Sequence, residues 1–283
     1  MRLDYYLPSP ACQSVLSIHA TAHEIGQTRI ETLPAMLPNL HIRLSGRSSF
    51  IPAHGKRISA PAVALIGPTS ASYCVELEPG CRLAVVGLLP AGWASLPALS
   101  DIDCTDQVLD GADIWGPALV STLLDRVRSR PLDGKHIPAI EAFLLRMLRP
   151  PSHTRQQQVA AIDHWLERSA ELRLDELCGH LGVGARQLRR LTLAGHGLSP
   201  KHLEMKYRAL RTAALICQAS PAVQADLTRQ LQAYADQPHL IRDFRRFIGW
   251  TPAAFLRESH NIAAATLNGR RLAGATRPLV LLS

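Results

Sequence analysis

The sequence predicts an α+β chain of two domains, a β-rich domain that ends in a helical pair and an all-α domain after it. Three observations predict this division. Short apolar stretches separated by Pro, Gly and Ser fill residues 1 to about 100, which is typical of strands and turns. From Asp113 to about Ser259 the apolar residues recur at helical spacing. A chain of 283 residues with 47% apolar residues is also long enough to bury two cores.

The N-terminal domain is expected to span residues 1–150, with helices from about residue 113. Its clearest strand candidates are the apolar stretches 41–44, 62–66 and 82–86. Two helices are expected at about 114–127 and 137–148. Pro150 and Pro151 cannot continue a helix, so we expect them to join the two domains.

The C-terminal domain is expected to span residues 151–260 and to be helical throughout. The last stretch, residues 261–283, contains small and polar residues without capping signals. We expect it to be a disordered tail.

The net positive charge of the chain comes from its second half. Residues 1–150 contain 13 Lys and Arg and 13 Asp and Glu, whereas residues 151–283 contain 18 and 10, which accounts for the whole formal charge of +8. A neutral half followed by a basic half indicates a nucleic-acid footprint in the second, although many basic surfaces bind no nucleic acid.

Cysteines and histidines give no metal or cofactor pattern. The six cysteines have no C-x-x-C spacing and are expected to be buried free thiols. The histidines at 19, 23, 41 and 54 lack the clustered spacing of a metal site. These spacings lead us to expect no metal and no cofactor. Because we find neither a signal peptide nor a membrane-spanning run, we expect a cytoplasmic protein.

Two short helices predict a first helix-turn-helix unit. Residues 174–181 place three leucines on one face, and Gly182 supplies the left-handed residue that ends a helix. Residues 184–191 then bury Leu188 and Leu191. The opposite face of this second helix carries Arg186, Arg189 and Arg190, with Gln187 beside them. Arginine suits guanine and phosphate, so this face is a candidate DNA contact, and a solvated charged face is the simpler alternative.

A second unit of the same kind follows about fifty residues later. Residues 227–234 are expected to form a short helix and residues 236–248 a longer one, whose buried face is apolar. Asp236 can cap this helix, and Pro238 lies in its first turn. The face left for solvent or DNA carries Gln237, His239, Arg242, Arg245 and Arg246.

A long helix should join the two units. Ser199 and Pro200 have the residue types of a cap and first position, and an apolar stripe continues to about Cys217. Such a helix is about 27 Å long. Successive major-groove faces of one duplex lie about 34 Å apart, so this helix can hold two recognition helices in adjacent turns of one groove.

Residues 155 to about 258 resemble the DNA-binding module of AraC/XylS-type regulators. The segments that carry the resemblance are Gly197–Lys201, Tyr234–Gly249 and Thr251–Phe255. The resemblance implies sequence-specific binding to promoter double-stranded DNA. It also implies that positions 186, 189, 190, 237, 239 and 242 face the bases or nearby phosphates. Two departures are Ala233-Tyr234, where the family has Gly before Phe or Tyr, and Gly184, where it has a Ser or Thr cap.

The N-terminal domain resembles, by its order and length, the cupin-like sensor and dimerisation region of the same family. This implies a small-molecule effector, a homodimer and, for an activator, RNA polymerase as a partner. Trp93 and Trp115 fit either a core or a ligand pocket. We expect no enzyme; the alternatives are a DNA-repair methyl acceptor, a cupin-type enzyme with the same module, or a fold that has lost DNA binding. The choices between activator and repressor, and between monomer and dimer, stay open.

Overall fold

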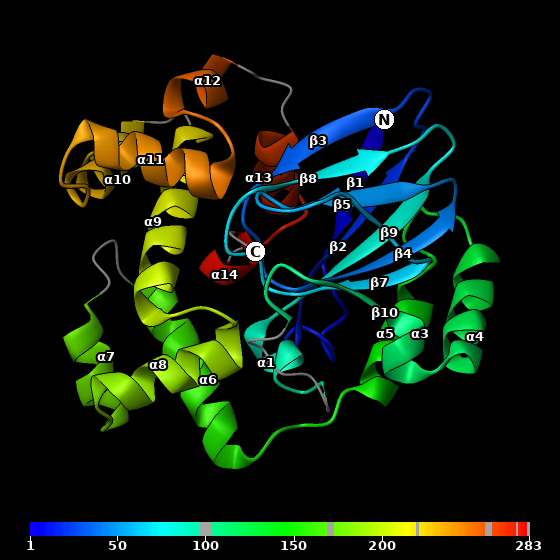
Figure 1. The fold of residues 1–283 in the computed structure, drawn as a ribbon, viewed down its shortest axis with the longest axis horizontal. Coiled ribbons are helices and arrows are strands. Elements are labelled where there is room, and N and C mark those ends of the chain that lie inside the picture. Colours follow the sequence, from blue (N-terminus) through cyan, green and yellow to red (C-terminus); the bar gives the residue numbers. More distant parts are fainter. Residues whose placement is uncertain (97–103, 169–172, 219–220, 258–261, 276, 282–283) are drawn as a thin grey trace.

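The computed structural model describes residues 1–96, 104–168, 173–218, 221–257, 262–275 and 277–281. The N-terminal half contains two antiparallel sheets that face each other (Figure 1). The larger sheet has the order β1 (Arg2–Tyr6), β2 (Leu16–His23), β9 (Arg82–Leu88), β4 (Asn39–Ser45), β7 (Val63–Ile66) and β10 (Val108–Asp110). The smaller has the order β3 (Arg29–Leu33), β8 (Tyr73–Leu77), β5 (Ser48–Ile51) and β6 (Ile58–Ser59).

Two apolar cores stabilise the N-terminal half. Between the sheets, Phe50, Tyr73 and Leu83 belong to one buried cluster. On the other face of the larger sheet, strand residues such as Leu40 pack with helical residues such as Val127. The helices near this half are α1 (Pro90–Trp93), α3 (Gly111–Trp115), α4 (Pro117–Arg128) and α5 (Ile137–Met147).

The expectations for this half are confirmed at the level of its elements. The three strand candidates lie in β4, β7 and β9, and the helical pair corresponds to α3–α4 and α5. Trp93 is 1% exposed and belongs to the core, while the Trp115 ring meets Phe143 edge to face at 5.3 Å. All six cysteines are free, and Cys12, Cys81 and Cys104 are buried.

The C-terminal half is helical. Its helices are α6 (His153–Arg168), α7 (Leu174–Leu181), α8 (Ala185–His196), α9 (Pro200–Ile216), α10 (Pro221–Gln232), α11 (Gln237–Ile248), α12 (Pro252–Arg257), α13 (Ile262–Leu272) and α14 (Pro278–Leu281). One buried cluster joins residues of α6, α8, α9 and α11. It also includes Leu37 and Leu89, so residues of the N-terminal half pack into this core. The domain boundary at Pro150 stays a prediction.

Local signals place several helix ends. Gly182 ends α7 with φ at 63°, and Gly197 and Gly249 end α8 and α11 in the same left-handed region. The Asp236 carboxylate accepts a hydrogen bond from the His239 amide at 2.7 Å and caps α11, as predicted. The helix expected at 227–234 is longer and begins at Pro221.

Over the residues that the structure describes, the expectation of a disordered tail at 261–283 is wrong. Residues Ile262–Leu272 form α13 and Pro278–Leu281 form α14. Ile262, Ala263, Thr266 and Leu267 are buried against the rest of the protein. Local sequence gave no signal because tertiary packing, rather than propensity or caps, provides most of the stability of a short helix. Within the described residues, no helix is both long and apolar enough to cross a membrane.

Leu267→Ala tests this packing of α13. Because Leu267 is 6% exposed, we expect a loss of about 2–5 kcal/mol in the free energy of unfolding. Leu272, 81% exposed on the same helix, is the matched control, and Leu272→Ala should change stability by less than about 0.5 kcal/mol. Urea unfolding measures both. Equal, small losses would show that α13 is not packed.

Candidate nucleic-acid interface

Helix α8 presents the predicted arginine face to solvent. Leu188 is buried, Gln187 is half-buried, and Arg186, Arg189 and Arg190 are exposed. Within the described part of the chain, none of these three guanidinium groups has a hydrogen bond or ion pair. Gly184 precedes the helix in extended conformation, and no side chain caps the first amides of α8.

Helix α11 is built in the same way. Phe244, Phe247 and Ile248 are buried, while Gln237, Arg242, Arg245 and Arg246 are exposed. The Arg246 guanidinium lies 5.3 Å from the centre of the Phe247 ring, a cation–π distance. Four of the five residues predicted on this helix therefore reach solvent.

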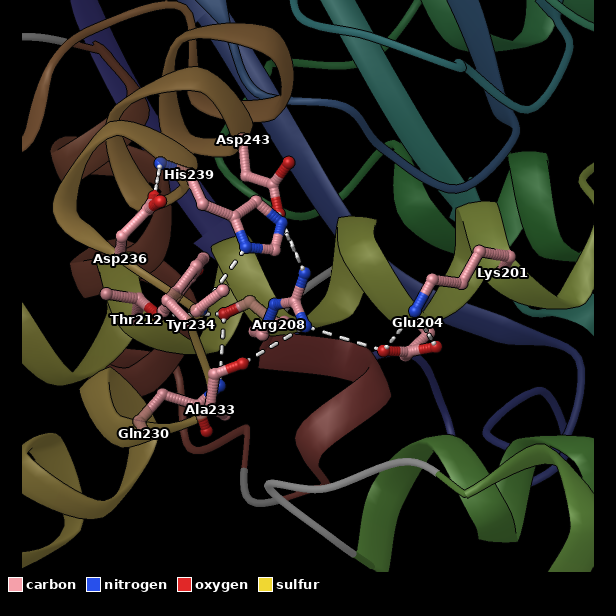
Figure 2. Close-up of polar contacts among 11 residues, drawn as sticks. Lys201, Glu204, Arg208, Thr212, Gln230, Ala233, Tyr234, Asp236, His239 and Asp243 are labelled. Carbon is pink, nitrogen blue, oxygen red and sulfur yellow. Dashed lines mark hydrogen bonds and ion pairs between the residues drawn. The ribbon is translucent and has the colours of Figure 1, made fainter.

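His239, the fifth, points inward to a buried arginine of α9 (Figure 2). Arg208 Nη2 lies 3.2 Å from His239 Nε2 and donates to the Asp243 carboxylate at 2.9 Å. The Arg208 side chain is 8% exposed and that of Asp243 is 1% exposed. Sequence analysis missed Arg208 and Asp243 because their pairing depends on the packing of α9 against α11.

Arg208 also fixes the turn before α11. Its Nη1 donates to the Ala233 carbonyl at 3.3 Å, and its guanidinium lies 4.7 Å from the centre of the Tyr234 ring (Figure 2). The Tyr234 hydroxyl meets Thr212 Oγ1 at 3.1 Å. Ala233 and Tyr234, which stand where the family has Gly before Phe or Tyr, need no left-handed backbone, because among the described residues only Glu24 and Asp106 combine a side chain with positive φ.

Helices α8 and α11 lie near opposite ends of α9 (Figure 1). The C-terminal end of each contacts the N-terminal half. Thr105 Oγ1 donates to the Gly197 carbonyl at 2.8 Å, after α8. The Ala35 amide donates to the Phe247 carbonyl at 2.7 Å, at the end of α11. The N-terminal turns of both helices, which carry Arg186 and Gln237, consequently point away from the N-terminal half.

Gly197 and Gly249, which end α8 and α11, allow both helices to approach the N-terminal half closely. A Cβ at Gly197 would lie 2.6 Å from Pro68 Cγ, and a Cβ at Gly249 would lie 2.4 Å from Thr32 Cγ2. Both glycines also have positive φ. Each position therefore requires glycine for its backbone and for its contact.

Loops of the N-terminal half also bind α9, the helix that connects α8 to the second pair of helices. His202 Nε2 donates to the Ser70 carbonyl at 2.8 Å. Lys206 is 2% exposed, and its Nζ donates to the carbonyls of Met36 at 2.7 Å and Thr69 at 3.1 Å. Burial lowers the pKa of Lys206 to about 7. The sequence held only an indirect signal, since Lys206 lies between the apolar positions Leu203 and Leu210.

The comparisons with known proteins bear on this arrangement. No family model and no curated protein sequence matches the chain. A solved structure of ToxT from Vibrio cholerae aligns with a TM-score of 0.50 at 10% identity, covering 84% of this chain and 98% of that one. The chain has the fold of ToxT. At this identity the likeness shows the fold alone.

Two further structures align less closely. Unsaturated fatty acid-bound ToxT from Vibrio cholerae has a TM-score of 0.48 at 10% identity, covering 90% of this chain and 94% of that one. The AraC-like transcriptional activator CuxR has a TM-score of 0.30 at 13% identity, covering 82% and 87%.

The N-terminal half contains an apolar cavity of about 80 Å³ between its sheets. Its lining includes Tyr5, His41, Tyr73, Thr266 and Arg270. Burial lowers the pKa of His41 to about 4, so its imidazole is neutral at physiological pH.

His19, His23 and His54 have different surroundings. His19 contacts Glu141 and His23 contacts Asp4, each at 3.1 Å, and His54 is exposed. The described ranges contain no group of three His, Cys, Asp or Glu side chains in a metal-binding arrangement.

Lys206→Met should flatten the pH dependence of stability above about pH 7. The folded chain releases the Lys206 proton near pH 7, whereas the unfolded chain keeps it up to about pH 10.5. Unfolding therefore takes up a proton in this window, and the contribution of Lys206 to the free energy of unfolding rises with pH. Below pH 7 both states are protonated and the contribution is constant.

Urea unfolding at several pH values between about 6 and 9 measures this difference. Lys201→Met is the matched control, because Lys201 lies on the same helix with a side chain that is 65% exposed. The control should keep the slope of the wild type. A gap between wild type and Lys206→Met that is constant with pH would contradict the assigned environment.

Proposed function

We propose that the protein is a sequence-specific, DNA-binding transcription regulator of the AraC type. The observation that carries this proposal is that α8 and α11 both expose an arginine-bearing face, while the C-terminal end of each helix contacts the N-terminal half. In this proposal, α7–α8 and α10–α11 are two helix-turn-helix units. Their second helices enter successive major-groove segments of promoter DNA.

The spacing of the two helices supports this geometry. Helix α9 has 17 residues, which gives a length of about 26 Å. Adjacent major-groove faces lie about 34 Å apart, and the widths of α8 and α11 add to the reach of α9. The excess charge of residues 151–283 would neutralise phosphates and make binding salt-dependent.

The side chains on the outer faces of α8 and α11, with the half-buried Gln187 among them, divide into two proposed roles. The side chains that would read base edges lie toward the N-terminal parts of α8 and α11: Arg186, Gln187, Arg189, Gln237 and Arg242. Arg190, Arg245 and Arg246 would contact phosphates. His239 would position the turn before α11, because its imidazole already faces Arg208 and Asp243.

The cavity in the N-terminal half supports a regulator that responds to a small molecule. We propose this half as the effector-binding part, with a homodimer and, for an activator, RNA polymerase as further partners. The methyl-acceptor alternative needs a thiol with a lowered pKa. Burial instead raises the pKa of Cys217 to about 11 and also raises those of Cys12 and Cys81. These three thiols therefore do not fit the role of a methyl acceptor.

Arg189→Ala should weaken binding of the full chain to its own preferred duplex, selected from a random library. The expected loss is about 1–3 kcal/mol, with relaxed preference at one base pair, because a guanine would lose its bidentate partner. Fluorescence anisotropy on cognate and random duplexes measures both effects. Arg126→Ala on α4, equally a loss of one exposed arginine, should change neither.

Two outcomes would count against this proposal. Equal losses on cognate and random DNA would remove the base-reading role of Arg189. A full chain that enriches no sequence would overturn the regulator itself.

A further inference from the structure

Helix α13 faces two different parts of the molecule at once. One stripe of its residues, which we name the cavity face, consists of Ile262, Thr266 and Arg270 and lines the cavity of the N-terminal half. The adjoining stripe, Ala263 and Leu267, belongs to the buried core of the C-terminal half. One short helix is thus a wall of the cavity and part of the core beneath α8 and α11.

The contact of α13 with the sheets is close and made by few groups. The Tyr5 hydroxyl of β1 donates to Thr266 Oγ1 at 3.0 Å. The Tyr5 ring lies against Gly269, where a Cβ would be 2.3 Å from Tyr5 Cδ2. Gly269 therefore lets α13 approach β1, and any side chain there would push the two apart.

The segment continues from the cavity to α6, which packs against α7 and α8 of the first proposed DNA-binding unit. Leu279 and Val280 of α14 share a buried cluster with Ile162 and Leu166 of α6. Arg277 Nη2 lies 3.3 Å from Glu167 Oε1 of α6. Displacement of α13 would therefore disturb the packing of α6.

The size of the cavity decides which wall must move. Small-molecule sites usually measure about 300–1,000 Å³. The cavity of about 80 Å³ is several times smaller, so a molecule of that class must displace a wall. Ladders of backbone hydrogen bonds hold the strands of both sheets, whereas α13 is held to them by side chains.

We propose that residues 262–275 and 277–281 form a coupling strap, which an apolar molecule entering the cavity displaces and which thereby changes the affinity of α8 and α11 for DNA. This inference rests on the proposed DNA-binding function. The strap provides the differential contact that a regulatory ligand needs, because the closed and displaced positions of α13 offer cavities of different size.

The experiment uses the full chain, its selected duplex and the apolar fluorescent probe 1-anilinonaphthalene-8-sulfonate. Saturating probe should change the DNA dissociation constant of the wild type by at least about fivefold, in the range usual for coupled sites. Gly269→Ala should imitate displacement: its affinity without probe should match that of the probe-bound wild type, and probe should change it less than twofold. Ala265→Ser, on the exposed side of α13, should behave as wild type.

A milder variant serves if Gly269→Ala does not fold. Tyr5→Phe removes only the hydrogen bond to Thr266, so the strap should open more easily and the probe should bind roughly fivefold more tightly. Unchanged probe affinity in Tyr5→Phe, or an unchanged probe response in folded Gly269→Ala, would overturn the strap.

Hydrogen exchange separates failure of the strap from failure of the proposed function. Probe should speed amide exchange in residues 262–272 of the wild type whether or not the protein binds DNA. Faster exchange without any duplex preference would support the strap and reject the regulator. Unchanged exchange in these residues at saturating probe would reject the strap.

Discussion

The rest of the arrangement depends on one constraint, which is the packing of α8, α9 and α11 against loops of the N-terminal half. Thr105 and Ala35 provide donors for carbonyls at the ends of α8 and α11. Between them, Lys206 donates to two loop carbonyls from the middle of α9. Buried carbonyls without partners are costly, so these contacts fix both exposed helices relative to one surface. The N-terminal half thereby determines where the two arginine faces point.

A second level of positioning lies within the C-terminal half. Arg208 connects α9 to α11 through Asp243 and to the preceding turn through Ala233. Such a buried pair is no guarantee of added stability, but removing one partner leaves an unpaired charge in the interior. The contact of Arg208 with His239 covers part of the polar side of α11, whereas Gln237 and Arg242 on the same helix are exposed.

Sequence reasoning succeeded where short-range chemistry decides the structure. Gly182, Asp236 and the Ser199-Pro200 pair act within a few residues of themselves, and each marks a helix end in the structure. It failed at α13, whose burial depends on Tyr5 more than 250 residues away. The inward turn of His239 and the burial of Lys206 were missed for the same reason. Each depends on a partner from another element, which no local pattern reveals.

The central claim is that two helices, held apart by α9 and aimed by one surface, read one duplex together. Hydroxyl-radical footprinting of the full chain on its selected duplex tests this most directly. Two protected blocks on one face, with centres about one helical turn or 10 base pairs apart, are the result that the arrangement of α8 and α11 predicts. A single block, or two blocks on opposite faces of the duplex, would contradict it.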